Sequence, residues 1–190
     1  MVGGEETAPS QQVMFDPGSQ LDYPAHAKVI TTDGILNADA FAKLDDESIH
    51  LQKNGLHFRT SAGWDDEAVK SSTPVMQHNI VNQDLINEIQ KSVREHVGDY
   101  NIDSLYHQYW PAGSYITWHR DRRDKAAMSI YLSGHHNDDG GYFMFDDGKG
   151  VKAVKPKPNR SVCVSGGIYH CVTTVNQGSP IRRSIQVWLR

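Results

Sequence analysis

The chain has few cysteines, only Cys163 and Cys171 among its 190 residues. Two cysteines cannot form the disulfide framework of a small secreted domain. We therefore expect both to be small buried apolar residues rather than metal ligands or nucleophiles. Reduced thiols suit an intracellular compartment, and the N-terminus lacks the basic and apolar segments of a secretory signal. These absences predict a cytoplasmic protein.

Long apolar runs and an excess of positive charge are also missing. No stretch of 18 apolar residues occurs, so we expect no transmembrane helix and no membrane partner. The formal net charge is −4 and the isoelectric point is about 6.2. The chain therefore has no overall basic field that would attract nucleic acid, and we expect no nucleic-acid partner. Its oligomeric state stays open.

The chain is long enough for one domain with a sizeable core. Residues 1–23 are polar and contain several Gly, Pro and Gln residues, which predicts a flexible N-terminal arm. Residues 24–190 are predicted to form a single domain, in which 24–104 are a strand and helix elaboration and 105–190 are the core. The segment 51–76, which includes Trp64, has no clear periodicity, so a place at a substrate mouth and plain surface loops both stay open.

The N-terminal half predicts one strand, at residues 27–32, and two helices. Asn37 is a good N-cap for a short helix through Leu44. A second helix is predicted over 82–97 and is ended by Gly98. It is indicated by apolar residues at every fourth position: Leu85, Ile89, Val93 and Val97. We expect this apolar stripe to pack on the outside of a sheet.

The C-terminal half reads as short apolar strands separated by Gly, Asn, Asp and Pro. Strands are expected at residues 126–132, 142–145, 161–164 and 182–188. Many short strands with turn signals between them predict a sandwich or a barrel. The predicted fold class is therefore mainly β with flanking helices (α+β), with the helices packed on the outer sheet.

His119 and Asp121 are the first candidates for a functional site. Because a strand has a period of two, these side chains point the same way at the end of a strand. His170 offers a third ligand, and two histidines with one carboxylate form the facial triad of non-haem Fe(II) oxygenases. We therefore expect His119, Asp121 and His170 to bind a metal. The adjacent His135 and His136 would point to opposite sides of a strand, so we do not predict a second metal site there.

An ordered series of features surrounds these residues from about Leu105 to Arg190. A Tyr and then Gly-Ser-Tyr precede the His-x-Asp motif, and a Tyr-Leu strand, an Asp-Gly-Gly turn and Pro-Lys-Pro follow it. His-x-Val-x-x-Val-x-x-Gly, Arg-x-Ser and a Trp complete the series. The pattern resembles the Fe(II)/2-oxoglutarate-dependent dioxygenases, in particular the prolyl-4-hydroxylase-like branch. One departure is the insertion of Ser179-Pro180-Ile181 before the arginine. The resemblance implies a double-stranded β-helix, or jelly roll, with iron in its open mouth.

The resemblance also implies the cofactors. Fe(II) would be held by the three ligands, with 2-oxoglutarate and O₂ as co-substrates and ascorbate as a reductant. Arg182 is expected to bind the far carboxylate of 2-oxoglutarate, because a guanidinium can clasp a carboxylate through two parallel hydrogen bonds. Ser184 lies two residues on and would add a further hydrogen bond. Arg183 would then point outward as a solvated side chain.

Tyr131 and Tyr109 are further candidates for the co-substrate site, because the resembling family often has a hydrogen-bonding tyrosine at each position. Each could instead be a core tyrosine whose hydroxyl is satisfied elsewhere, and both readings stay open. Trp118 and Trp188 are expected to be packing residues. Residues 120–125 form a charged loop at the expected mouth.

The expected function is Fe(II)- and 2-oxoglutarate-dependent hydroxylation of an unactivated C–H bond in a prolyl residue of a peptide or protein. The carboxylate of Asp121 favours hydroxylation over halogenation, since the related halogenases carry a small residue there. Two alternatives stay open. One is hydroxylation of a free amino acid or another small molecule by the same superfamily. The other is a cupin-like metal-binding protein that uses no 2-oxoglutarate.

Overall fold

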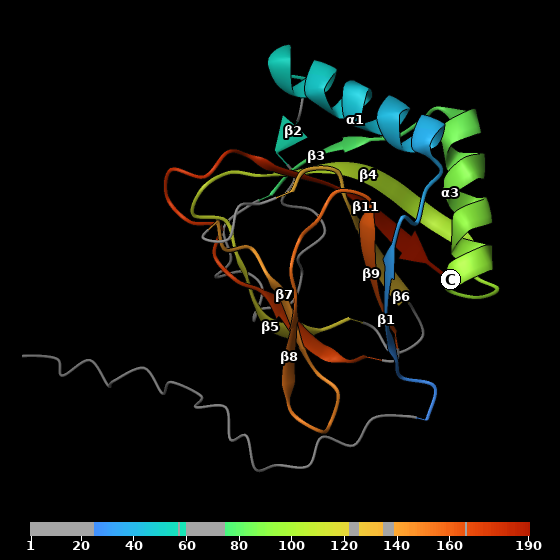
Figure 1. Ribbon diagram of the computed structural model, residues 1–190, viewed down its shortest axis with the longest axis vertical. Coiled ribbons are helices and arrows are strands. Elements are labelled where there is room, and N and C mark those ends of the chain that lie inside the picture. Colours follow the sequence, from blue (N-terminus) through green and yellow to red (C-terminus); the bar gives the residue numbers. More distant parts are fainter. Residues whose placement is uncertain (1–24, 57, 60–74, 122–125, 135–138, 166) are drawn as a thin grey trace, which may run out of the picture.

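The computed structural model describes residues 25–56, 58–59, 75–121, 126–134, 139–165 and 167–190. These residues form two antiparallel sheets, and the helices α1 (Ala38–Lys53) and α3 (Gln83–His96) lie on the outer side of the larger sheet (Figure 1). The prediction of a mainly β jelly roll with flanking helices is confirmed. The predicted arm at 1–23, most of the segment 51–76 with Trp64, and the pair His135-His136 lie outside the described residues.

The larger sheet has the strand order β1-β9-β6-β11-β4-β3-β2, and the smaller sheet has the order β5-β10-β7-β8. The strands of the larger sheet are β1 (Val29–Asp33), β2 (Phe58–Arg59), β3 (Met76–Asn79), β4 (Ile102–Trp110), β6 (Ala126–Tyr131), β9 (Arg160–Ser165) and β11 (Arg182–Leu189). Those of the smaller sheet are β5 (Ile116–Arg120), β7 (Phe143–Asp146), β8 (Val151–Val154) and β10 (Tyr169–Val172). Neighbouring strands are often far apart in sequence, so the sheets depend on long-range pairing.

The two faces of the larger sheet pack against different partners, because successive strand residues point to opposite sides. On the outer face, Ile185 and Val187 of β11 pack in one core with Leu85 and Ile89 of α3. On the inner face, Tyr131 of β6 and Trp110 of β4 join a second core with strands of the smaller sheet. The apolar stripe of α3 therefore covers the sheet from outside, as predicted.

The asparagine N-caps are observed in both helices, but α1 is longer than expected. The side chain of Asn37 accepts a hydrogen bond from the Ala40 amide, 2.9 Å away, and Asn82 does the same for the first turn of α3. The predicted end of α1 at Leu44 is wrong, because the helix continues to Lys53. Its buried face includes the polar Ser48, which interrupts the apolar period in the sequence.

Replacing Ile89 by alanine is expected to lower the free energy of unfolding by about 2–5 kcal/mol, because Ile89 is fully buried in the outer core. Urea unfolding followed by circular dichroism measures the change. Lys91 lies on the exposed face of the same helix, so Lys91→Ala should change stability by less than about 0.5 kcal/mol. Equal losses in the two variants would contradict the packing of α3 on the sheet.

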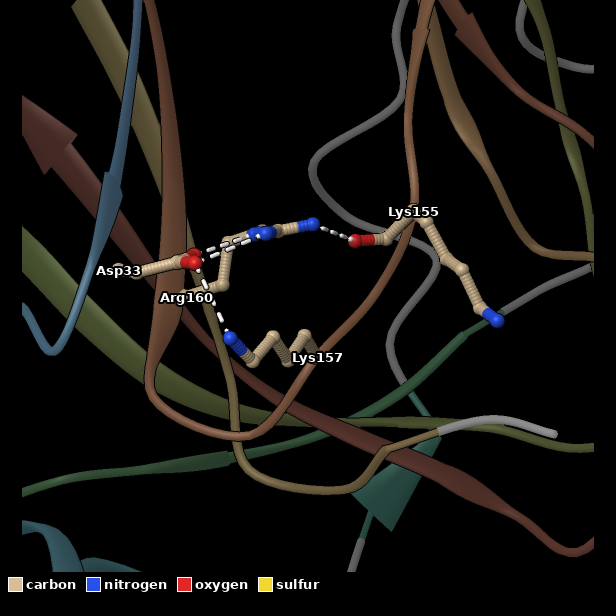
Figure 2. A network of polar contacts seen from close by, with 4 residues as sticks. All are labelled: Asp33, Lys155, Lys157 and Arg160. Carbon is tan, nitrogen blue, oxygen red and sulfur yellow. Dashed lines mark hydrogen bonds and ion pairs between the residues drawn. The ribbon is translucent and has the colours of Figure 1, made fainter.

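A polar network ties the end of β1 to β9 and to the connection from β8 (Figure 2). Asp33 accepts hydrogen bonds from the guanidinium of Arg160 and, at 3.1 Å, from Lys157. Arg160 also donates to the backbone carbonyl of Lys155, 3.1 Å away. The contacts with Arg160 and then Lys157 hold the pKa of Asp33 far below its usual range. In Figure 2 the ammonium group of Lys155 points away from this network.

Both cysteines are free and buried, as predicted. Burial raises the pKa of Cys163 to about 12 and that of Cys171 to about 11. Both thiols are therefore protonated at neutral pH, which suits packing residues. Among the described residues, no helix has the length and the apolar character needed to cross a membrane.

Candidate metal centre

Three potential metal ligands meet in the smaller sheet. His119 lies near the end of β5, Asp121 directly follows that strand, and His170 of β10 is the cross-strand partner of His119. Nε2 of His119 is 3.8 Å from Oδ1 of Asp121, and Nε2 of His170 is 3.7 Å from Oδ2. One ligand atom of each residue lies within 4.8 Å of the other two. Within the part of the chain that the structure describes, no other group of three such residues is this close.

The backbone orients both imidazoles toward this point. Nδ1 of His119 is 2.8 Å from the carbonyl oxygen of Thr117, and Nδ1 of His170 is 2.8 Å from that of Ile168. A carbonyl accepts only, so Nδ1 carries the proton and donates, and Nε2 keeps its lone pair. This arrangement fixes the tautomer of metal-ligating histidines. Both lone pairs therefore face the carboxylate of Asp121.

Burial keeps His170 neutral. The pKa of His170 lies below its ordinary value, because burial disfavours the charged ring more than the nearby Asp121 favours it. Neutral imidazole is the form that binds a metal. The ring of Phe143 stacks on the same imidazole at 5.2 Å between centroids. His119 and Asp121 are only partly buried, so one side of the group stays accessible, as a catalytic metal site requires.

Arg182 lies on the inner face of the larger sheet and is 2% exposed. Its guanidinium carbon is 4.1 Å from the ring centroid of Trp110 and 5.7 Å from that of Tyr131. One nitrogen donates to the carbonyl of Gly141, whereas Nε is buried without a hydrogen-bond partner. Burial lowers the pKa of Arg182 to about 10, so the side chain is charged at neutral pH.

No acidic side chain among the described residues forms an ion pair with Arg182. A buried charge is normally paired, because removing it from water is costly. A buried cation with one unsatisfied N–H group can therefore accommodate an anion, and a carboxylate fits it through two parallel hydrogen bonds.

Ser184 and Tyr131, two further candidates for the co-substrate site, lie beside Arg182. They are direct cross-strand partners on β11 and β6, and both are buried. The hydroxyl of Ser184 accepts a hydrogen bond from Nε1 of Trp110, 3.2 Å away, which leaves its own hydrogen available to a ligand. Burial raises the pKa of Tyr131 to about 12, so this hydroxyl is also protonated and can donate.

The structure does not bring Tyr109 to this site. Its hydroxyl donates to the backbone carbonyl of Ser48 in α1, 3.1 Å away, on the outer face of the larger sheet. Its cross-strand partner Arg183 points the same way and forms an ion pair with Asp45. Tyr109 is thus a core tyrosine. The expectation that Arg183 is solvated is wrong, because its side chain is only 13% exposed under α1.

Two residues at the anion site were not predicted from the sequence. Trp110 lies opposite Arg182 in the sheet and covers its guanidinium. Gly141 was expected only as a turn residue, but its carbonyl binds Arg182, and a Cβ atom on it would lie 3.1 Å from that guanidinium. The sequence could have pointed to Trp110, because adjacent strand residues face opposite sides and either Tyr109 or Trp110 had to face inward. It does not say which of the two does so.

Trp118 and Trp188 both pack against other side chains, as expected. The rings of Trp118 and Tyr169 stack at 5.1 Å between centroids, and Trp188 packs against the inner core. Arg120 lies 5.9 Å from the ring of Tyr169. The remainder of the charged loop, residues 122–125, lies outside the described residues.

Comparisons with known proteins agree with this geometry. Residues 104–190 match the family model described as the 2OG-Fe(II) oxygenase superfamily. This match covers the strands of the C-terminal part of the chain, including all three potential metal ligands and Arg182. The superfamily implies an oxidoreductase of the dioxygenase type that uses Fe(II), 2-oxoglutarate and O₂. The His-Asp-His group fits an iron, and Arg182, which has no acidic partner among the described residues, fits a dicarboxylate. No match was found among curated proteins.

Solved structures of oxygenases share the fold over most of the chain. A prolyl-4-hydroxylase from Pseudomonas putida is similar at 18% identity and a TM-score of 0.66, over 87% of this chain and 94% of that one. A prolyl hydroxylase from Trichoplax adhaerens, in complex with a hypoxia-inducible-factor peptide fragment, is similar at 14% identity and a TM-score of 0.64, over 85% and 82%. The α-ketoglutarate-dependent epimerase SnoN of nogalamycin biosynthesis is similar at 12% identity and a TM-score of 0.64, over 86% and 78%. At these identities the likeness shows the fold alone.

Proposed function

We propose that the chain is a 2OG-Fe(II) oxygenase that hydroxylates an unactivated C–H bond in a prolyl residue of a peptide or protein. The observation that carries the proposal is the buried guanidinium of Arg182, which has no carboxylate partner among the described residues and an unsatisfied Nε. It belongs to the larger sheet, and the potential metal ligands belong to the smaller sheet that faces it. A dicarboxylate that chelates the metal at one end and binds Arg182 at the other suits this arrangement.

The metal would be held by His119, Asp121 and His170. The two histidines are already oriented through their Nδ1 contacts with backbone carbonyls, and Asp121 supplies the negative charge. When bound, Fe(II) supplies the oxygen chemistry: 2-oxoglutarate loses CO₂ and becomes succinate with one oxygen atom of O₂, and the other oxygen atom enters the substrate C–H bond. Ascorbate would serve as the reductant that keeps the iron ferrous.

The protein would hold the co-substrate through the residues around Arg182. The guanidinium binds the far carboxylate, and the hydroxyls of Ser184 and Tyr131 can donate to it. Trp110 covers the guanidinium from one side and so excludes water, which strengthens the ion pair in this buried place. The charge of Arg182 and the two hydroxyl groups beside it therefore favour a short dicarboxylate over a neutral ligand.

The choice of a prolyl residue is supported by the prolyl hydroxylases among the structures that share the fold. The Trichoplax enzyme was solved with a peptide fragment, which supports a peptide substrate. Because the same fold also occurs in an epimerase, the substrate has to be decided by experiment. A free amino acid or another small molecule is the alternative outcome.

The direct test is succinate formation by protein loaded anaerobically with Fe(II) and then given 2-oxoglutarate and air. Wild-type protein should form succinate, and prolyl peptides should accelerate the reaction. His170→Ala removes a buried ligand and should form none. If the metal-loaded wild type neither binds 2-oxoglutarate nor forms succinate, the proposal is wrong and the cupin-like reading takes its place. If succinate forms and only free amino acids accelerate it, the peptide part is wrong.

A further inference from the structure

A row of polar side chains crosses the inner face of the larger sheet next to Arg182. Gln77 of β3 pairs with Gln108 of β4, and Gln108 pairs with Ser184 of β11. Directly opposite residues in antiparallel strands project from the same face. Trp110 lies on the inner face and donates a hydrogen bond to Ser184. Gln108 is two residues from Trp110 on β4 and therefore faces the same side. The row therefore belongs to the inner face. It becomes more buried toward the site, from the half-exposed Gln77 to Gln108, which is 4% exposed.

Gln108 carries an unsatisfied acceptor in this row. Its Oε1 atom is buried and has no hydrogen-bond partner. Gln186, a similarly buried glutamine on the same face, is satisfied, because its Oε1 accepts from the hydroxyl of Ser129, 2.9 Å away. Buried polar atoms nearly always have a partner, and leaving one unpaired is unfavourable. The difference between the two glutamines points to a ligand that supplies a donor to Gln108.

The chemistry of the ligand follows from the atom that lacks a partner. A carbonyl oxygen needs an N–H or O–H donor. The dianion of 2-oxoglutarate has only acceptor oxygens, so it cannot satisfy Oε1 of Gln108. Of the two organic molecules that the reaction brings to the site, the one that is oxidised can supply this donor. Gln77 is the cross-strand partner of Gln108, and the backbones of neighbouring strands are about 5 Å apart. The row therefore presents two neighbouring side-chain amides. An extended peptide has donors and acceptors that match such a row.

We propose that Oε1 of Gln108 accepts a hydrogen bond from a backbone N–H of a peptide substrate, and that Gln77 extends this contact toward the sheet edge. The inference rests on the proposed function and names a residue that recognises its substrate. The donor belongs to a residue that flanks the oxidised proline, because a prolyl residue within a chain has no N–H. Gln108 thereby selects a peptide and fixes its register at the metal.

The test uses full-length protein loaded with Fe(II) and a library of acetylated, amidated peptides with a central proline. The variant Gln108→Met removes the acceptor while keeping the side-chain length. It should raise the KM of the best peptide about tenfold, while the Kd for 2-oxoglutarate, measured anaerobically, stays within about twofold. Gln83→Met is the matched control, because Gln83 is an exposed glutamine on α3, and it should change neither value.

A second measurement has a wild-type arm that does not depend on the folding of a variant. Peptides that are N-methylated at one backbone position at a time are compared on the wild type and on Gln108→Met. One N-methyl group should raise KM about tenfold on the wild type and add nothing on Gln108→Met, because both changes remove the same hydrogen bond. If every N-methyl effect is equal on the two proteins, or no N-methyl group has an effect on the wild type, the inference is wrong.

The remaining outcomes separate this inference from the proposed function. A wild type that binds 2-oxoglutarate but is accelerated by no peptide would contradict the role of Gln108 and leave the co-substrate site standing. A Gln108→Met variant that loses 2-oxoglutarate affinity and keeps its peptide KM would assign Gln108 to the co-substrate, and so overturn the inference. A wild type that binds no 2-oxoglutarate would refute both.

Discussion

Replacing Asp121 by alanine is expected to abolish substrate hydroxylation and to reduce succinate formation by at least about 100-fold. Asp121 contributes the single carboxylate among the three potential ligands, and its two oxygens face the Nε2 atoms of both histidines. Changes in the residues that merely support metal ligands already cost 10- to 100-fold in affinity or activity. Loss of a ligand should therefore exceed that range. Fe(II) binding at equilibrium and succinate formation measure the two consequences.

Asp147→Ala is the matched control for this variant. Asp147 is a carboxylate in the turn after β7 that pairs with Lys152, away from the three ligands in sequence and contacts. Its removal should leave Fe(II) binding and succinate formation within about twofold of the wild type, since surface ion pairs contribute little. Full activity of Asp121→Ala, or an equal loss in both variants, would refute the assignment of Asp121 as a ligand.

Replacing Arg182 by methionine should raise the Kd for 2-oxoglutarate by roughly 100-fold, because truncating one partner of a buried charge pair typically costs about 2–5 kcal/mol in binding. Methionine keeps an unbranched side chain between Trp110 and Tyr131 and removes the charge. Fe(II) affinity should be unchanged, because Arg182 and the three ligands lie on different sheets. Titration of 2-oxoglutarate into anaerobic, Fe(II)-loaded protein measures the first quantity, and Fe(II) titration measures the second.

Arg183→Met provides a control at the adjacent position. Arg183 lies on the outer face and pairs with Asp45 of α1, so this variant should keep its 2-oxoglutarate affinity within about twofold. Its free energy of unfolding should fall, because Asp45 loses its partner in a partly buried place. If the two variants lost 2-oxoglutarate affinity equally, the anion site would not be the inner face of β11.

Much of the fold could be predicted because its signals are local. The helix α3 was found from apolar residues at every fourth position, and Asn82 and Gly98 mark its two ends in the structure as well. The strands at 126–132 and 182–188 were located to within a residue or two. The length of α1 was missed, because Ser48 lies in its buried face and the sequence shows a polar residue where the apolar period requires an apolar one.

In the candidate site, too, the features with a local sequence signal could be predicted and the others could not. His119 and Asp121 could be paired from their spacing along one strand, and the order of motifs around them suggested His170, Arg182, Ser184 and Tyr131. The structure brings His119, Asp121 and His170 together. It places Ser184 and Tyr131 beside the buried guanidinium of Arg182. For Tyr109 the sequence left a co-substrate role and a core role open, because its position along the chain does not say which face of β4 it occupies, and the structure shows the core role.

The sequence by itself determined the periodicities, the caps and turns, and the set of residues from which a metal site can be built. The tertiary structure alone decided which face of each strand is the interior. It turned Trp110 inward and Tyr109 outward, and it placed Gln108 beside Ser184. The physical reason is that the alternation along a strand is a local property, whereas the strand order and register depend on contacts between residues far apart in the chain.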